Sequence, residues 1–378
     1  MKPLLFLPSI VRSTFVLLLS AIAVLAQSSF TPPGAQTART AGEWPTYLEA
    51  GASPSDQIVT GPSAGAKPLI RSFTGLGTSF TGLEDTRTHS FLAYPAQMSA
   101  GVRVATGDVN GDGILDIVTG PGPGAQTHVK VFDGITSAEI RSFFAYTPSF
   151  FGGVFVASGD VNGDGLADII TGADAGTAGG HVKVFDGRTG AELRSFFAFP
   201  GYSGGVRVGA GDVNDDGFAD IIVGTGFGLG HVKVFDGANN ALLASFFAYG
   251  PSFTGGVFVA AGDLNGDGHI EIITGAGING HVKAFDGSTL AEVRSFIPFP
   301  GFTGEVHVAG GDIDKDRVDD IIVGAGPGAG PHVKIFSGGN SNRLISFRAS
   351  DPASADGVYV TASPMAAPDP RARAIPQN

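Results

Sequence analysis

The sequence predicts an all-β protein, and three observations support this prediction. The 378-residue chain contains 59 glycines and 29 phenylalanines, while only 15% of its residues are charged. So much glycine would weaken helices, whereas glycine and aromatic residues suit short strands joined by tight turns. Short runs of Val, Ile and Phe stand between Gly and Asp residues, and a whole unit of such runs recurs along the chain. Cysteine is absent, which excludes disulfides and thiol chemistry.

The recurring unit is about 50 residues long. Its most regular part is an Asp-rich segment, GDVNGDGILDIVTG in its first copy. Copies of this segment begin at spacings of 52, 52, 51 and 49 residues, at Gly107, Gly159, Gly211, Gly262 and Gly311. A second segment of the type HVKVFDG recurs in step, beginning at His128, His181, His231, His281 and His332. Such a fixed period is typical of propellers and solenoids.

Each unit divides into four short runs of strand-forming residues. In the second unit these runs are Val154–Ala157, Asp168–Thr171, His181–Phe185 and Ala191–Phe197. Four strands in about 50 residues is the size of one propeller blade. We therefore expect a β-propeller of four-stranded blades, in which each blade is buried against its neighbours.

The two ends of the repeated region together supply a sixth blade. Near the N-terminus, Asp56–Gly61, Leu69–Gly75 and Ser90–Tyr94 match the second, third and fourth runs, and Gly357–Thr361 near the C-terminus matches the first. Residues 56–362 should therefore form a six-bladed propeller that is closed by pairing of its N- and C-terminal strands. The sixth blade should lack an Asp-rich loop, because the chain ends fall at that point.

The flanking segments have a different composition. Residues 1–26 predict a secretory signal peptide, because the apolar run Thr14–Ala26 follows two basic residues and ends in a cleavage-like Val-Leu-Ala. A membrane anchor is the alternative, although the run is short for a span of about 20 residues. Residues 27–55 predict a linker or leader, and residues 363–378 predict a disordered tail. The predicted location is therefore secreted or at the cell surface, with no membrane span after signal cleavage.

The Asp-rich segment predicts a calcium-binding loop. Its pattern, D-x-[ND]-x-D-G-x-x-[DE], places oxygen side chains at positions one, three, five and nine, and the glycine at position six permits a tight turn. Six to eight oxygens at roughly 2.3–2.6 Å suit Ca²⁺ better than Mg²⁺. The predicted ligands are Asp108, Asn110, Asp112 and Asp116; Asp160, Asn162, Asp164 and Asp168; Asp212, Asn214, Asp216 and Asp220; Asp263, Asn265, Asp267 and Glu271; and Asp312, Asp314, Asp316 and Asp320.

The alternative is that Asp-Gly and Asn-Gly only form hairpin turns. Turns alone would not require four oxygens at fixed offsets in five copies. The five loops also hold 18 of the 35 acidic residues, and such clusters repel unless a cation neutralises them. Up to five Ca²⁺ ions would nearly balance the formal charge of −12.

These motifs resemble a known family. The run GGVFVASGDVNGDGLADIITGADAGTAGGHVKVFDG, which starts at Gly152, is similar to the FG-GAP/VCBS repeat of the integrin α-subunit propeller and of secreted bacterial proteins. The resemblance covers residues 56–362 and implies calcium loops on one face, with ligand recognition on the opposite face. The chain departs from the family pattern in having six blades instead of seven, and in Arg317 where the fifth loop should have glycine.

The function that we expect is binding or adhesion to an extracellular protein or glycan, by a non-enzymatic monomer. A polysaccharide lyase or hydrolase is one alternative, and a purely structural surface protein is another. No GxSxG, HExxH or phosphate-loop motif occurs, and five of the eight histidines recur at one strand position. The net charge of −12 argues against nucleic acid.

Two kinds of loop should lie on the face opposite the Asp-rich loops. One kind is Gly-rich and follows the second strand, as in GPGPGAQT from Gly120. The other is aromatic and follows the fourth strand, as in YTPSFF from Tyr146. The aromatic rings either contact a ligand or seal the junctions between blades, and their recurrence favours sealing.

Overall fold

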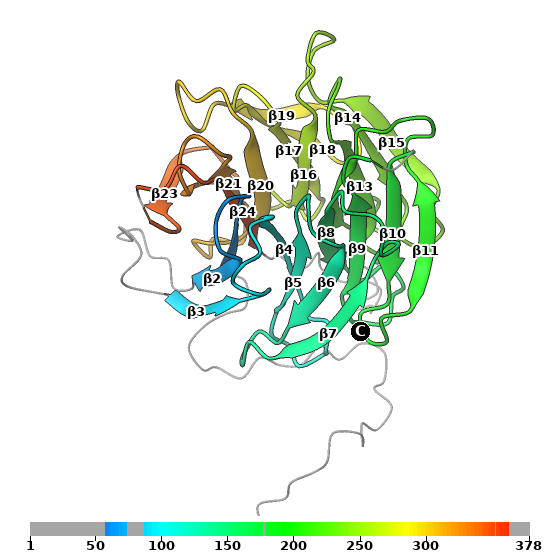
Figure 1. The fold of residues 1–378 in the computed structure, drawn as a ribbon. Helices are drawn as coiled ribbons and strands as arrows, with labels where there is room; N and C mark the ends of the chain where they lie inside the picture. The colour runs from blue at the N-terminus through cyan, green and yellow to red at the C-terminus, as the bar shows by residue number, and fades with distance from the viewer. Residues whose placement is uncertain (1–56, 74–86, 177–178, 352, 363–378) are drawn as a thin grey trace, which may run out of the picture. The chain divides into compact units, whose positions relative to one another are not determined.

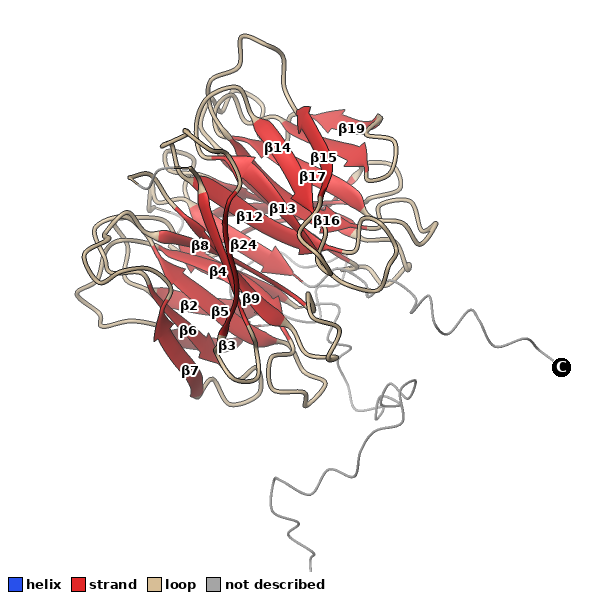
Figure 2. Ribbon diagram, turned by 90° about the vertical axis from the view of Figure 1, so that its right-hand side faces the viewer, coloured by secondary structure: helices blue, strands red, loops and turns tan. Residues whose placement is uncertain are grey.

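The computed structural model describes residues 57–73, 87–176, 179–351 and 353–362, and the predicted signal peptide, leader and tail lie outside these ranges. The described residues form strands and loops without a helix (Figure 2). No helix in this part of the chain is therefore long and apolar enough to cross a membrane.

Twenty-four strands form six four-stranded antiparallel sheets, which confirms the predicted number of blades (Figure 1). Blades 1 to 5 each contain four consecutive strands, and blade 6 has the order β24-β1-β2-β3. The strands of blades 1 to 3 are β4 (Val102–Gly107), β5 (Asp116–Pro121), β6 (His128–Phe132) and β7 (Glu139–Phe144); β8 (Val154–Gly159), β9 (Asp168–Ala173), β10 (His181–Phe185) and β11 (Glu192–Phe197); and β12 (Val206–Gly211), β13 (Asp220–Thr225), β14 (His231–Phe235) and β15 (Leu242–Phe247). Those of blades 4 to 6 are β16 (Val257–Gly262), β17 (Glu271–Ala276), β18 (Val282–Asp286) and β19 (Glu292–Phe296); β20 (Val306–Gly311), β21 (Asp320–Ala325), β22 (His332–Phe336) and β23 (Arg343–Arg348); and β24 (Val358–Ala362), β1 (Ile58–Pro62), β2 (Leu69–Phe73) and β3 (Arg87–Leu92).

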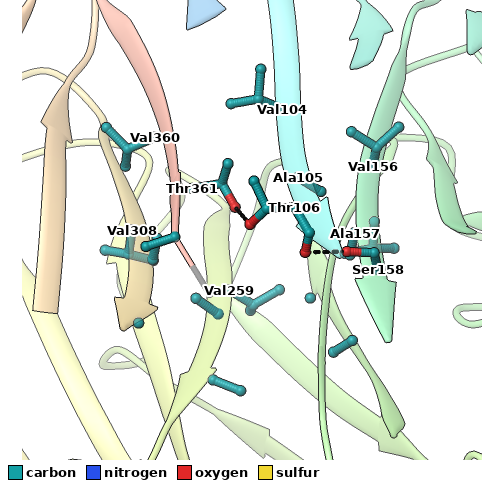
Figure 3. Close-up of a pocket in the computed structure, with 18 residues that line it drawn as sticks. Val104, Ala105, Thr106, Val156, Ala157, Ser158, Val259, Val308, Val360 and Thr361 are labelled. Carbon is teal, nitrogen blue, oxygen red and sulfur yellow. Dashed lines mark hydrogen bonds between the residues drawn. The ribbon is translucent and has the colours of Figure 1, made fainter. Parts of the chain in front are cut away.

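The first strand of each blade is the innermost. These strands contact one another in the order β4, β8, β12, β16, β20 and β24, and β24 returns to β4, so the ring is closed. They line a central channel with a cavity of about 100 Å³, toward which Val104, Val156 and Val308 contribute small apolar side chains (Figure 3).

The N- and C-terminal ends of the repeated region pair as predicted. Strand β1 runs antiparallel to β24, with Ile58 opposite Ala362 and Gly61 opposite Tyr359. The Thr361 hydroxyl lies 3.4 Å from the hydroxyl of Thr106 on β4, so the last inner strand also contacts the first, its neighbour in the ring (Figure 3). The prediction of closure by the two ends is therefore confirmed.

Burial decreases from the inside of each blade to the outside. In blades 1 to 5 the second strand is buried at all six positions and the third mainly at alternate positions, while the fourth is mostly exposed in blades 1 to 3. The continuous apolar runs such as DIIVG follow from this, because both faces of a second strand pack against other blades. Close packing also explains the recurring glycine there: a Cβ at Gly275 would lie 2.3 Å from the carbonyl oxygen of Val306 in the next blade.

The first ring of each aromatic loop seals a blade junction. Tyr146 is buried, and its hydroxyl donates to the carbonyl oxygen of His181 in the next blade at 2.9 Å. Tyr94 and Tyr249 make the same bond to the carbonyl oxygens of His128 and His281. The sealing interpretation is therefore confirmed for these rings, whereas Phe151 and Phe227, on the same face, are exposed.

Candidate metal centres

The five Asp-rich loops connect the first and second strands of blades 1 to 5, and therefore lie at one end of the propeller. Position one follows the first strand directly, and position nine is the first residue of the second strand. In blade 6 the equivalent strands, β24 and β1, belong to opposite ends of the repeated region, so the described part of that blade has no such loop.

The loop backbone turns in the same way in all five copies. Positions four and six have positive φ in each loop, and glycine occupies both positions in the first loop, at Gly111 and Gly113. Arg317 occupies position six of the fifth loop and adopts a φ of 70°, close to the 85° of Gly113. The departure at Arg317 therefore does not abolish the turn, although a side chain is disfavoured in this conformation.

The carboxylate at position one organises each loop. In the second loop, Asp160 accepts hydrogen bonds from the backbone N–H groups of Gly163, Asp164 and Gly165 at 2.6, 3.2 and 2.8 Å. Asp108 accepts the corresponding three bonds in the first loop. The chain is thus wrapped around this carboxylate, with its N–H groups directed inward.

Positions three and five form shorter turns of the same kind. The side-chain oxygen of Asn162 accepts from the N–H of Asp164 at 2.9 Å, and that of Asp164 accepts from the N–H of Leu166 at 3.0 Å. Both side chains are more exposed than Asp168 at position nine. The carboxylate of Asp164 has a second oxygen that remains available to a cation, and the single oxygen of Asn162 has a second lone pair.

The acidic residue at position nine is the most buried predicted ligand in every loop. These residues are at most 1% exposed: Asp116, Asp168, Asp220, Glu271 and Asp320. Burial raises the pKa of all five carboxyl groups to about 7, even though backbone N–H donors favour the ionised form. A bound dication would offset this cost of burial.

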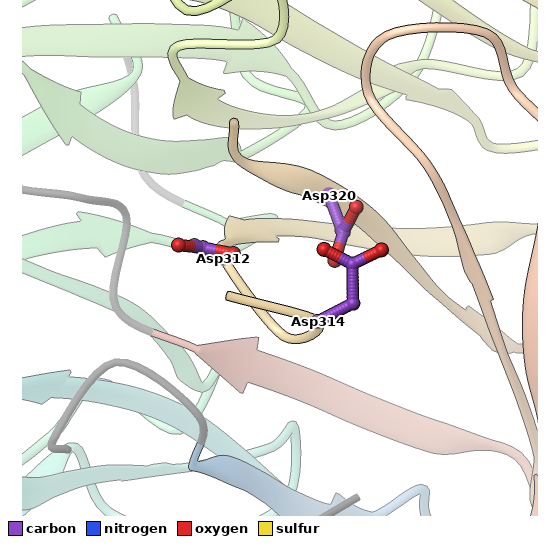
Figure 4. Close-up of side chains that lie close together, drawn as sticks. All are labelled: Asp312, Asp314 and Asp320. Carbon is purple, nitrogen blue, oxygen red and sulfur yellow. The ribbon is translucent and has the colours of Figure 1, made fainter. Parts of the chain in front are cut away.

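The fifth loop brings three carboxylates together (Figure 4). Asp312, Asp314 and Asp320 each offer one oxygen, and these oxygens lie within 4.8 Å of one another. Oδ1 of Asp320 is buried and has no hydrogen-bond partner, so a buried acceptor there is left unsatisfied by the protein. An all-oxygen cluster with such an acceptor fits a hard divalent cation.

In the first, second and fourth loops the amide of the asparagine at position three faces the acidic residue at position nine, whereas Asn214 of the third loop faces Asp216 and Asp236. Nδ2 of Asn110 lies 3.2 Å from Oδ1 of Asp116, and the same contact joins Asn162 to Asp168. Turning the amide by 180° exchanges its oxygen and nitrogen, so this position can also present an oxygen. The predicted residues of these loops are therefore adjacent. Among the described residues, three carboxylates converge in the fifth loop.

The sequence prediction did not include an acidic residue from the turn between the third and fourth strands. Oδ2 of Asp133 lies 3.3 Å from Nδ2 of Asn110, and Asp236 makes a similar contact, at 3.5 Å, with Asn214. The signal was present in the repeated HVKVFDG segment, whose aspartate recurs at Asp186 and Asp286. Each of these four aspartates accepts N–H bonds in its own turn, so a structural role explains it.

The five recurring histidines are also structural. In each, Nε2 lies 2.5–2.9 Å from the hydroxyl of a serine on the fourth strand of the same blade. Of the unrepeated histidines, His269 contacts Asp215 in the neighbouring loop, and His307 contacts the carbonyl oxygen of Val358. The side chain of His89 lies outside the described residues.

Comparison with known proteins agrees with these repeats. Models of the FG-GAP-like repeat match residues 160–223 and 212–274, and that of the FG-GAP repeat matches residues 100–131. Integrin alpha-V of Gallus gallus is 32% identical over 144 residues, which cover 34% of this chain and 14% of the integrin. The chain thus contains FG-GAP repeats and is similar over part of its length to an integrin α-subunit.

The solved structures that match this chain have low sequence identity and TM-scores below 0.5 in three cases. U3-55K superimposes with a TM-score of 0.48 at 14% identity, covering 79% of this chain and 80% of its own. The exotype rhamnogalacturonan lyase YesX gives 0.42 at 14% identity, with coverages of 79% and 63%. A rhamnogalacturonan lyase of Bacillus licheniformis gives 0.40 at 15% identity, with coverages of 78% and 65%.

Proposed function

We propose that this FG-GAP repeat propeller is a calcium-binding module that is secreted or held at the cell surface and recognises an extracellular protein or glycan. The observation that carries the proposal is the set of five phased loops, in which oxygen side chains surround a common backbone turn. The similarity to an integrin α-subunit supports an extracellular location and a binding role.

Calcium suits these loops better than other divalent cations. The predicted donors are carboxylate and amide oxygens, with a backbone carbonyl at position seven, and there is neither a cysteine in the chain nor a predicted histidine ligand. Flexible oxygen-rich loops accommodate the large coordination number of Ca²⁺, while Mg²⁺ requires a stricter octahedron. In this proposal each ion links position one, which follows the inner strand, to position nine, which begins the second strand of the same blade.

A binding role is favoured over catalysis, and a monomer remains our expectation. A catalytic site needs a unique group of residues, whereas most histidines here repeat from blade to blade and are bonded to serine. The face opposite the loops is the more suitable binding surface, because its exposed side chains include Phe151, Phe227 and Leu229.

The proposal is tested by metal analysis, melting and a binding screen. Chains dialysed against calcium should carry up to five ions, and their melting temperature should exceed that of chains kept in EDTA, because a ligand of the native state raises the free energy of unfolding. The same two samples would be screened against a glycan array and extracellular-matrix proteins. Equal melting temperatures with no bound calcium would refute the metal centres, and an empty screen would refute the binding role.

A further inference from the structure

A ring of large side chains lies at the mouth of the channel opposite the Asp-rich loops. The second residue of every inner strand contributes to it, and the six residues are Arg103, Phe155, Arg207, Phe258, His307 and Tyr359. Each is paired with a glycine on the adjacent strand, as Arg207 is with Gly224. A Cβ on any of these glycines would collide with the inner strand of the next blade, as at Gly224 and Val257. The six blades thus place arginine, phenylalanine, histidine and tyrosine side chains around one mouth.

The aromatic rings of this mouth cover the faces of the two guanidinium groups. Cζ of Arg103 lies 4.2 Å from the ring centre of Phe155, and Cζ of Arg207 lies 3.7 Å from that of Phe258. His307 and Tyr359 stack at 4.1 Å. Stacking fixes the plane of each guanidinium and leaves its edges, which carry the N–H donors, to make hydrogen bonds.

Both arginines have a buried Nε without an acceptor among the described residues, but the hydrogen bonds of their other nitrogens differ. Arg103 donates from Nη1 to the carbonyl oxygen of Pro121 at 2.9 Å and from Nη2 to Asp174 at 2.6 Å. Arg207 is only 9% exposed, yet its Nε and Nη1 are buried without an acceptor among the described residues. Its closest carboxylate oxygen, Oε2 of Glu305, is 3.8 Å from Nη2, which is beyond hydrogen-bond distance.

A purely structural role does not account for Arg207. The charge of Arg207 is balanced in part by the ring of Phe258 and by Glu305, but its two buried donors are unmet. Unmet buried donors destabilise a fold, and an apolar side chain of similar size would fill the same space at lower cost. Two other inner strands do place phenylalanine at this position, at Phe155 and Phe258. A stacked guanidinium with unmet edge donors has instead the geometry that binds a carboxylate through two parallel hydrogen bonds.

Acceptors surround this donor. The side chains of Asp174 and Glu305 are 18% and 27% exposed at the same mouth, and Oε1 of Glu305 lies 3.2 Å from Nε2 of His307. Because these carboxylates would repel a ligand that offers only negative charge, the ligand should also carry hydroxyl donors. Phe227, 59% exposed on the same face, offers an apolar ring surface.

We propose that this mouth binds a uronate residue of an acidic glycan, with the sugar carboxylate on Arg207 and sugar hydroxyls on Asp174 and Glu305. A uronate combines a carboxylate, hydroxyl donors and an apolar ring face, which matches the groups present here. An acidic peptide supplies the carboxylate without the hydroxyls. This inference rests on the proposed binding function and narrows its ligand to one class.

The test compares acidic sugars with their uncharged counterparts. Trimers of galacturonate, glucuronate and mannuronate, each also as its methyl ester, would be titrated calorimetrically into the calcium-loaded full chain. At least one acidic trimer should bind tenfold or more tightly than its ester, and R207M should weaken that binding by a similar factor. R188M removes an exposed arginine from a turn at the opposite end and should leave the affinity unchanged.

Folding of the variants is checked by melting. R207M should be as stable as the wild type, because it removes two buried donors that have no acceptor, whereas R103M should be less stable because it removes the close partner of Asp174. If R207M does not fold, R207K is the second variant. It keeps the positive charge but lacks the two parallel N–H donors of the guanidinium, so it should bind the acidic trimer several-fold more weakly than the wild type.

Several results would overturn the inference. These are equal affinity for acid and ester, undiminished binding by R207M or R207K, or preference for a poly-glutamate peptide. If the screen finds a neutral glycan or a protein ligand while the acidic trimers fail to bind, only this inference falls and the proposed function stands.

Discussion

At the scale of single residues, the loops depend on a backbone conformation that few side chains adopt. Position six has a φ between 70° and 89° in all five loops, and four of the five copies use glycine. Arg317 is the exception, and it lies in the loop where Asp312, Asp314 and Asp320 converge. The sequence raised doubt about this loop because glycine was replaced, but the conformation is retained and the extra carboxylate of Asp314 takes part in the cluster.

We predict that R317G raises both the stability of the protein and the calcium affinity of the fifth loop. A left-handed conformation costs a non-glycine residue about 1–2 kcal/mol, and the entropy of glycine in the unfolded chain offsets roughly half of this. Removing the positive charge also removes repulsion of a dication. The melting temperature in EDTA should therefore increase slightly. The reciprocal change G165R in the second loop should lower it, and an increase with G165R would contradict the argument.

The recurring histidines provide a pH-dependent contribution. Burial, followed by the nearby charges of Arg348 and Lys334, lowers the pKa of His332 to about 4. The native state therefore binds fewer protons than the unfolded state, in which the pKa is about 6.5. This contribution to stability is complete above pH 6.5 and is lost as the pH falls toward 4.

We predict that H332Q makes unfolding less sensitive to acid. Between pH 7 and 5 the wild type should lose about 1 kcal/mol more stability than the variant, after allowance for the partial exposure of the ring. Denaturant unfolding of both proteins at the two pH values gives this difference, and comparing the two cancels the titration of the carboxylates that they share. Parallel pH profiles would show that the ring does not titrate differently in the folded chain.

At the scale of elements, the N–H groups that bond to the position-one carboxylate come from the same loop, while backbone bonds such as that from Ala219 to the carbonyl oxygen of Asp160 join neighbouring loops. The predicted ligands of each loop lie within nine consecutive residues, so their spacing alone was informative. Contacts between distant segments were less predictable. Asp133 reaches Asn110 only because strand β6 returns beside β5, and a single sequence does not show that the turn after β6 ends at the same height as the loop.

We predict that D160A removes one calcium ion per chain and leaves the other sites occupied. The substitution deletes one predicted ligand and the acceptor of three backbone N–H groups, so it should also lower the stability by about 1–3 kcal/mol. Equilibrium dialysis with elemental analysis gives the stoichiometry. D186A changes an aspartate of a neighbouring turn and should retain the full number of ions. Loss of several ions from D160A would show that the loops are coupled.

At the scale of the whole molecule, the repeat period was sufficient to predict the number of blades and the closure, since a propeller requires each inner strand to have two neighbours. It was not sufficient to predict the ring of arginine and aromatic residues at the channel mouth. Those six residues are spaced about 50 positions apart, and the residue type changes from each blade to the next. They read as variable positions in the sequence, and only the closed ring brings them into contact.

The last prediction concerns this closure. Strand β24 supplies the inner strand of blade 6, buries Val358 and Val360, and contacts both β20 and β4. Removing it would leave β1 without its inner partner and expose the channel-side faces of two neighbouring blades. We predict that a chain ending at Ala355 loses most of its stability, since burial of the two valines alone contributes roughly 3–5 kcal/mol.

A chain ending at Ala362 is the matched control and should melt like the full chain, because it keeps every residue of β24. Melting curves of the three chains provide the comparison, with the peptide GVYVTA added to the shortest chain to restore the strand in trans. Such a peptide can pair with the exposed edge of β1 as the native strand does. If the chain ending at Ala355 melted at the temperature of the control, the terminal strand would not be needed to hold the ring together, and the stability would have to reside within the individual blades.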